Sequence, residues 1–131
     1  MTAKKNILGE TMIMRYRMSN RDVFYGGGVV NGARTITYQS DVAERLMVKL
    51  YGNSGRCRAV KRIRLYDPVY AGDYLEFHAK VTATDGDMPI IEVRAFKIAA
   101  VPENPPFESS IDILEDPTIA VVSVFQYEPL P

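Results

Sequence analysis

Apolar and polar residues alternate along most of the chain, and this alternation predicts strands. Between residues 11 and 18, Met12, Met14, Tyr16 and Met18 fall on one face, and Ile13, Arg15 and Arg17 fall on the other. Between residues 74 and 84, four inward positions are apolar, and they are Leu75, Phe77, Ala79 and Val81. Further strands are predicted over 56–66, 90–101 and 118–127. The pattern therefore predicts five strands.

Residues 31–51 are the one stretch with helical spacing. The apolar residues of one face are Ile36, Ala43, Leu46, Met47 and Leu50, and the opposite side carries Asp41, Glu44, Arg45 and Val48. Asn31 is a candidate N-cap, and the glycines that follow residue 51 end the helix. One helix between a first strand and four later strands predicts an α+β fold. In this fold a twisted antiparallel sheet of about five strands wraps around one central helix.

Two other segments have distinctive compositions. Strict alternation in the strand over 56–66 would put Arg56, Arg58, Val60, Arg62 and Arg64 on one face and Cys57, Ala59, Lys61, Ile63 and Leu65 on the other. Residues 102–117 are rich in proline and acidic residues, which predicts a long loop outside the core.

Composition narrows the class of protein. The 131 residues fit one domain, over 1–131, with 47% hydrophobic and 24% charged residues. Sixteen basic and sixteen acidic residues cancel, so no net charge would draw the protein to nucleic acid or to a membrane. The single cysteine excludes an internal disulfide and a cysteine-based metal site. No segment reads as a signal peptide or membrane span, so we expect a cytoplasmic protein without a bound metal.

Several blocks of sequence resemble one enzyme family. The segment RIRLYDPVYAGDYLEFHAKV resembles the middle strands of the hotdog fold and their Gly-Asp turn. The blocks YGGGVVNGAR, SDVAERLM, DPVYAGDYLEF and EVRAFKIA occur in the order found in the β-aminoacyl-CoA ammonia lyases of amino-acid fermentation. The positions that match this pattern are Tyr25, Gly26, Gly27, Asn31, Gly32, Ala33 and Asp41. The resemblance implies a hotdog fold and an ammonia lyase that acts on a short-chain β-aminoacyl-CoA.

The chain departs from the family pattern at two places. The family has an acid four positions after the matched aspartate, where this chain has Arg45, and Glu44 stands one position earlier. The family also tends to carry a histidine just before the Tyr-Gly block, where this chain has Val23 and Phe24. Both changes fall in the expected pocket and bear on the substrate.

The implied reaction needs particular groups. A carboxylate must remove the proton next to the thioester carbonyl, and Asp41 is the favoured base, with Glu44 as a second anion for the leaving ammonium. Helix N-termini supply N–H donors for the enolate oxygen, and glycines let a thioester approach the backbone. The substrate-binding candidates are therefore Gly26, Gly27, Gly28, Asn31 and Gly32, with Tyr25 as a further catalytic candidate. Arg58, Arg62 and Arg64 are candidates for the CoA phosphates, and no cofactor is expected because CoA belongs to the substrate.

Each candidate also has a plain structural interpretation. The glycines fit a tight turn, Asn31 fits a simple N-cap, the arginines fit a solvated strand face, and Asp41 with Arg45 fits a surface ion pair. His78 fits an outward strand position and Cys57 a small core residue. A straight helix from Asn31 would put Asp41 far from its own helix entrance. Either the regular helix begins near Thr37, which we favour because residues 35–38 are poor helix formers, or Asp41 serves a neighbouring subunit.

Three alternatives to the lyase remain open. A hotdog acyl-CoA thioesterase would use a helix acid and backbone donors to activate water. A β-hydroxyacyl dehydratase fits less well because it relies on a histidine near the helix entrance. A non-catalytic CoA-ester sensor or assembly subunit is the third. For all of them one open sheet edge predicts a homodimer or larger homo-oligomer, with the helices side by side and the site between subunits.

Overall fold

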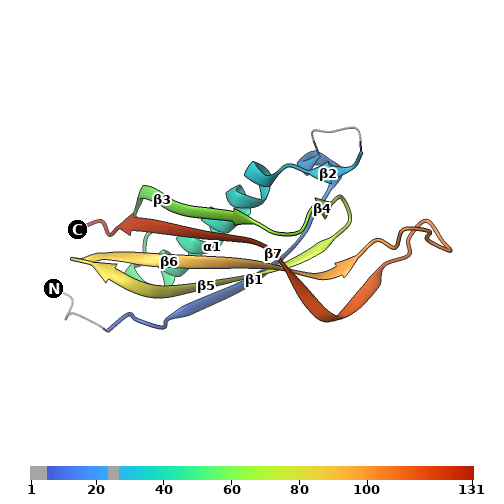
Figure 1. Ribbon diagram of the computed structural model, residues 1–131. Helices are drawn as coiled ribbons and strands as arrows, with labels where there is room; N and C mark the ends of the chain where they lie inside the picture. Colours follow the sequence, from blue (N-terminus) through green and yellow to red (C-terminus); the bar gives the residue numbers. More distant parts are fainter. Residues whose placement is uncertain (1–5, 24–26) are drawn as a thin grey trace.

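A five-stranded antiparallel sheet and one long helix make up the fold (Figure 1). The computed structural model describes residues 6–23 and 27–131. In chain order the elements are β1 (Thr11–Arg17), the short 3₁₀ helix η1 (Asn20–Asp22), β2 (Val29–Val30), α1 (Gly32–Tyr51), β3 (Arg56–Leu65), β4 (Val69–Tyr70), β5 (Tyr74–Asp85), β6 (Met88–Ala100) and β7 (Asp112–Glu128). The sheet order is β1-β5-β6-β7-β3. The predicted arrangement, one helix on a five-stranded antiparallel sheet, is confirmed.

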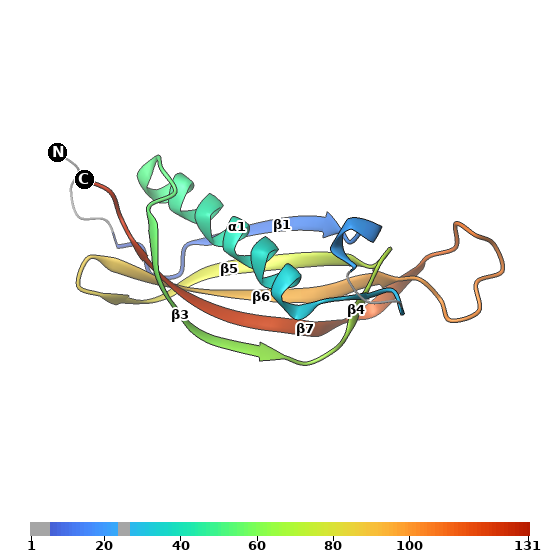
Figure 2. The same ribbon diagram turned by 90° about the horizontal axis from the view of Figure 1, so that it is seen from above.

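The core lies between α1 and one face of the sheet. The helix packs against β1, β5, β6 and β7, with its first turn at the end where β2 and β4 lie (Figure 2). The predicted inward positions of β5 are all buried, as are Ala43, Leu46 and Met47 of α1. The alternation of β1 is also confirmed, because its residues alternate between exposed and partly buried. These packed side chains supply most of the apolar burial that stabilises the domain.

Both helix ends follow from the sequence. The Asn31 side-chain oxygen accepts a hydrogen bond from the Arg34 N–H at 3.0 Å, so Asn31 is the predicted N-cap. The helix ends at Gly52, which adopts the left-handed backbone with φ of 79° that glycine takes readily. The helix is regular from Gly32 onward, so the favoured start near Thr37 is wrong. Packing against the sheet outweighs the poor helix propensity of residues 35–38.

A buried glutamine connects the helix to the sheet. Gln39 is fully buried, and its Nε2 donates to the carbonyl oxygens of Val93, at 3.0 Å, and Val121, at 3.1 Å. These carbonyls belong to β6 and β7. The amide therefore fixes the position of the middle of α1 over two central strands.

The predicted faces of β3 are confirmed for most paired residues, but they are wrong for Ala59 and Val60, which change sides because the strand contains two bulges. Its pairing with β7 shifts between Cys57 and Ala59 and again between Val60 and Arg62, so Arg58 and Lys61 have no register partner. Residues opposite each other in an antiparallel pair share a face. Four residues of β3 pair with buried residues of β7: Cys57 with Tyr127, Val60 with Phe125, Ile63 with Ser123 and Leu65 with Val121. These four residues therefore form the inward face of β3.

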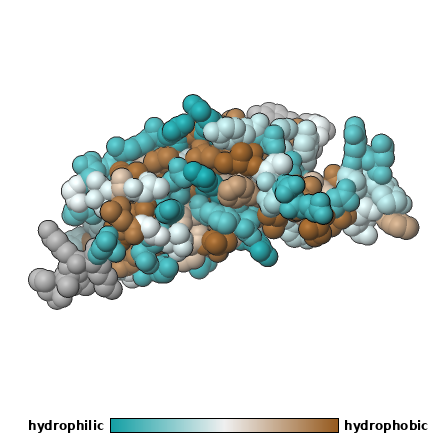
Figure 3. All heavy atoms as spheres, turned by 60° about the horizontal axis from the view of Figure 1, so that its bottom comes forward, coloured by the Kyte–Doolittle hydropathy of each residue, from teal (hydrophilic) through white to brown (hydrophobic). Residues whose placement is uncertain are grey.

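Two short features were missed by the pattern. β2 and β4 form a two-stranded sheet of their own, in which Val29 pairs with Tyr70 and Val30 with Val69. Residues 112–117 belong to β7, because Asp112 and Ile113 pair with Ala100 and Ala99. The predicted loop over 102–117 is therefore shorter, and together with the first part of β7 it forms an arm that projects from the sheet (Figures 1 and 3). The arm lies outside the core as predicted, since Phe107 is 73% and Ile113 82% exposed.

Candidate active site

Asp41 lies on the exposed side of α1 and is held by a tyrosine of β1. The Tyr16 hydroxyl donates to Oδ2 of Asp41 at 2.5 Å. Burial and the hydrogen bond to Asp41 raise the pKa of Tyr16 to about 12, so the phenol keeps its proton at neutral pH. Among the described residues no ion pair joins Asp41 to Arg45, the partner that helical spacing offered. The carboxylate accepts from a tyrosine instead.

Glu44 lies one turn further along the helix and points to a different strand. Its Oε2 accepts a hydrogen bond from the Tyr127 hydroxyl of β7 at 3.1 Å. Burial, with a smaller contribution from the Glu44 charge, raises the pKa of Tyr127. Since β1 and β7 are separated in the sheet by β5 and β6, the two carboxylates are held on opposite flanks of α1. The structure therefore does not bring Asp41 and Glu44 to one point, which their shared helical side suggested.

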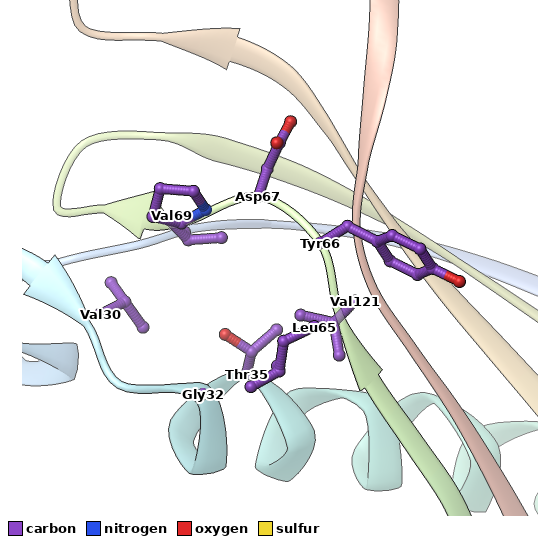
Figure 4. A pocket seen from close by; sticks show the side chains of 9 residues that line it. Val30, Gly32, Thr35, Leu65, Tyr66, Asp67, Val69 and Val121 are labelled. Atoms are coloured by element: carbon purple, nitrogen blue, oxygen red, sulfur yellow. The ribbon is translucent and has the colours of Figure 1, made fainter.

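A pocket of about 190 Å³ opens beside the first turn of α1 (Figure 4). Its apolar walls are Val30, Leu65, Val69 and Val121, and the hydroxyl of Thr35 points into it. A Cβ atom on Gly32 would lie 3.1 Å from a Leu65 methyl carbon, so the glycine lets Leu65 approach the helix entrance closely. Gly32 at the predicted entrance therefore borders a small pocket, whereas Gly27 and Gly28 do not line it.

The same turn presents backbone donors. The N–H groups of the first helical turn have no partner within the helix. The Arg34 N–H donates to the side-chain oxygen of the N-cap, Asn31. No described residue accepts a hydrogen bond from the N–H groups of Gly32 and Ala33. These two groups, at the positive end of the helix dipole, can stabilise a developing oxyanion. Asp41 lies roughly 13–14 Å further along the same straight helix, by the rise per residue.

The sequence pattern did not predict a buried carboxylate, Asp22, near the helix entrance. Asp22 is fully buried and accepts from the Ser19 N–H at 2.7 Å, from Arg34 Nε at 2.7 Å and from the Tyr38 hydroxyl at 2.9 Å. Burial by itself would raise the pKa of Asp22, but these donors together hold that pKa below its ordinary value. The network joins the end of η1 to the first turns of α1.

The other predicted residues have varied surroundings. Tyr25 and Gly26 lie outside the described residues. Gly27 is exposed, and the carbonyl of Gly28 accepts from the Ala71 N–H at 3.0 Å, which ties the glycine-rich segment to the turn after β4. Asn31 uses its side-chain oxygen as the N-cap, as its plain structural interpretation predicts.

The arginines of β3 are exposed but do not form one continuous row. Arg62 and Arg64 share the outward face with Arg56, while Arg58 stands at a bulge. Cys57 is exposed, so the prediction of a core cysteine is wrong. His78 is half-buried on the outward face of β5, where Nε2 lies 2.6 Å from Oε1 of Glu76.

The described residues contain neither a metal-binding cluster nor a membrane-spanning helix. In the ranges 6–23 and 27–131, no group of three or more His, Cys, Asp or Glu side chains is arranged to hold a metal ion. Over the same ranges, no helix is long and apolar enough to cross a membrane.

Known proteins resemble this chain in sequence and in structure. No protein-family model matches the sequence. The chain is 34% identical over 107 residues to 3-aminobutyryl-CoA ammonia lyase of Acetoanaerobium sticklandii, which covers 82% of this chain and 84% of that protein. The structure of β-alanyl-CoA:ammonia lyase from Clostridium propionicum superposes with a TM-score of 0.82 and 27% identity, over 92% of this chain and 85% of that one.

More distant structures share the fold. A hexameric thioesterase from Yersinia pestis superposes with a TM-score of 0.72 at 15% identity, over 94% of this chain and 88% of that chain. At this identity the likeness shows the hotdog fold alone.

Proposed function

This chain belongs to the β-aminoacyl-CoA ammonia lyase family, and we propose that it eliminates ammonia from, or adds ammonia to, a short-chain β-aminoacyl-CoA thioester such as 3-aminobutyryl-CoA. The observation that carries the proposal is the 34% identity to 3-aminobutyryl-CoA ammonia lyase over most of both chains. The small pocket beside the helix entrance, with four apolar side chains in its walls, suits a short acyl group. No resident cofactor is proposed, because CoA enters and leaves with the substrate.

Asp41 is the proposed base. Its carboxylate takes the proton next to the thioester carbonyl, the electron pair forms the carbon–carbon double bond, and the C–N bond breaks with its electrons leaving on ammonia. The negative charge that develops on the thioester oxygen is stabilised by the N–H groups of Gly32 and Ala33. Exposure on the helix surface makes Asp41 the more accessible of the two carboxylates, since Glu44 is partly buried against Tyr127.

Two copies of the chain form each proposed site. Within one chain Asp41 lies roughly 13–14 Å from Gly32, too far to act on a carbonyl bound at that entrance. Apart from the approach of Leu65 to Gly32, the inward face of β3 is left largely open, and it exposes Val60 at 48%, Ile63 at 45% and Leu65 at 60%. We propose that a second copy covers this face, so that Asp41 of one subunit serves the helix entrance of the other.

The β3 arginines are proposed to bind the CoA phosphates. Arg62 and Arg64 share one face of β3, Arg58 stands at a bulge of the same strand, and Leu65 of this strand borders the pocket. One guanidinium group can bind two phosphate oxygens at once through two parallel N–H···O hydrogen bonds.

The activity test uses crotonyl-CoA with ammonium and the Asp41→Asn variant. Wild-type protein should form the amino product, and D41N should lose about two to four orders of magnitude in kcat while its affinity for CoA esters stays the same. Glu44→Gln serves as the matched control and should lose less. Wild-type turnover by D41N would exclude Asp41 as the base. Release of free CoA from saturated acyl-CoAs, without addition or elimination, would make the protein a thioesterase.

Mixed oligomers test the shared site. Asp41→Asn removes the base, and Gly32→Val places methyl groups against Leu65 at the entrance. When the two variants are coexpressed, a mixed dimer contains one site with both changes and one intact site. A random mixture should therefore regain about a quarter of wild-type activity if sites are shared. Activity no greater than that of the single variants would place both groups in the same subunit.

A further inference from the structure

The aromatic side chain beside Asp41 has a role that the family resemblance did not assign. We propose that Tyr16 is a positioning residue, which fixes the Asp41 carboxylate in the orientation that proton removal requires. This inference rests on the proposed function, in which Asp41 is the base.

The contact joins two elements that are separate in sequence. Tyr16 comes from β1 and Asp41 from the middle of α1, and their hydrogen bond is 2.5 Å long. Hydrogen bonds to an ionised acceptor are shorter and stronger than those between neutral groups. No described residue donates a hydrogen bond to Oδ1 of Asp41. One carboxylate oxygen is therefore held by the phenol, and the other is available to a substrate.

The Tyr16 ring is itself held in place. Its centroid lies 4.9 Å from that of Tyr38 and 5.7 Å from that of Phe77, which is fully buried in β5. Tyr38 is fixed in turn by its hydrogen bond to the buried Asp22. An exposed aspartate on a helix surface ordinarily samples several rotamers, and a rigid donor restricts it to one. Because the Tyr16 ring is packed against the core, its hydroxyl holds the Asp41 carboxylate in one orientation.

The protonation of Tyr16 suits this role. Burial is the largest reason that the pKa of Tyr16 rises to about 12, followed by the hydrogen bond and the charge of Asp41. Among neighbouring groups, Arg45 acts in the opposite direction and Tyr38 adds slightly to the rise. The phenol therefore remains a donor throughout the pH range in which the enzyme would work, and it does not act as a base itself.

The first measurement compares kcat with KM in Tyr16→Phe. The phenylalanine keeps the ring packing and removes only the hydroxyl. We expect kcat to fall by about tenfold, the loss typical of one hydrogen bond to a charged group, with KM unchanged. Tyr74→Phe is the matched control, because Tyr74 adjoins the same edge of the sheet but stacks with Arg17 on the outward face. It should leave both constants as in the wild type.

The second measurement is a double-mutant cycle. If Tyr16 acts through Asp41, adding Tyr16→Phe to Asp41→Asn should lower the residual kcat by less than about twofold. A merely structural loss would lower kcat in both backgrounds by the same factor. That additive result would overturn the proposal.

The third measurement needs no turnover. The pKa of the Tyr16 phenol can be measured by NMR titration of ¹³C-labelled tyrosine. In Tyr74→Phe this pKa should equal that of the wild type, and in Asp41→Asn it should be lower. The shift back toward 10.0 should be partial, since burial remains. An unchanged phenol pKa in Asp41→Asn would overturn the positioning role whatever the activity. A lowered phenol pKa in a protein without lyase activity would leave the contact intact and reject the proposed reaction.

Discussion

β5 and β3 have similarly alternating sequences, yet only β5 has the faces that alternation predicts. Every second residue of β5 from Leu75 to Val81 is buried, while β3 has only Ala59 partly covered. β5 lies between β1 and β6 with α1 over its inner face. β3 is an edge strand, paired with β7 alone. The same pattern is thus reliable in one strand and misleading in the other.

The difference has a physical cause. In a central strand, a shift of one residue within the buried stretch would move its apolar side chains from the core to solvent. The two register shifts between β5 and β6 accordingly flank the buried positions, one before Leu75 and one after Val81. An edge strand whose side chains are mostly exposed loses little when a residue is left unpaired, and bulges are common there. In β3 two such residues, Arg58 and Lys61, move Val60 onto the face of Ile63 and Leu65. Burial, rather than alternation alone, decides which residues share a face.

The largest effect should come from the interior of β5. Phe77→Ala removes a fully buried ring and should lower the free energy of unfolding by about 3–5 kcal/mol. Thr82→Ala, on the exposed face of the same strand, should change it by less than about 0.5 kcal/mol. Urea unfolding at one protein concentration measures both. Equal losses would show that β5 is not the two-faced strand described above.

A charge on the inward face of β3 should affect assembly instead of folding. Ile63→Asp places a carboxylate in the face proposed to meet a second copy, so light scattering at micromolar concentration should show a smaller particle than for the wild type. Ile13→Asp is the control, because Ile13 is 54% exposed on β1 at the other edge of the sheet. A monomeric wild type, or dissociation by Ile13→Asp alone, would refute the choice of the β3 edge.

The outward face of β3 should affect substrate affinity. Changing Arg58, Arg62 and Arg64 to Gln should raise KM for the CoA ester by about tenfold or more, with kcat nearly constant, since phosphate binding contributes equally before and during the reaction. Gln at Arg15, Arg17 and Arg94 gives the same change in net charge on other strands. If both triple variants have the wild-type KM, the β3 arginines face solvent or another subunit.

The smallest effect should come from the outward face of β5. His78 and then Arg15 hold the pKa of Glu76 below its ordinary value. A lowered folded-state pKa means that Glu76 stabilises the protein above the ordinary carboxyl pKa and that this contribution is lost as the pH falls through the folded value. In Glu76→Gln the free energy of unfolding should therefore fall less steeply at acidic pH than in the wild type, by less than about 1 kcal/mol. Thermal melts between pH 3 and 7 would measure it, and a steeper limb would contradict the assignment.

Local signals in the sequence account for most of the fold and less of the site. Alternation predicts β1 and β5 because each has one face against α1, and Asn31 and Gly52 delimit the helix through their own backbone preferences. The Asp22–Tyr38 and Tyr16–Asp41 contacts join residues sixteen and twenty-five positions apart, and no local pattern specifies which tyrosine meets which acid. The bulges of β3 likewise leave no local signal in its alternating sequence.

The Gln39 amide limits how this scaffold can diverge. A shift of α1 by one helical turn, about 5.4 Å, would carry the amide away from the carbonyls of Val93 and Val121 and leave buried polar groups without partners. The core therefore sets the spacing between Asp41 and the helix entrance, and no ligand can easily reset it. A descendant of this chain that accepts a bulkier acyl group would have to gain room by trimming wall residues such as Leu65, or by reorienting its subunits, while the helix stays where it is.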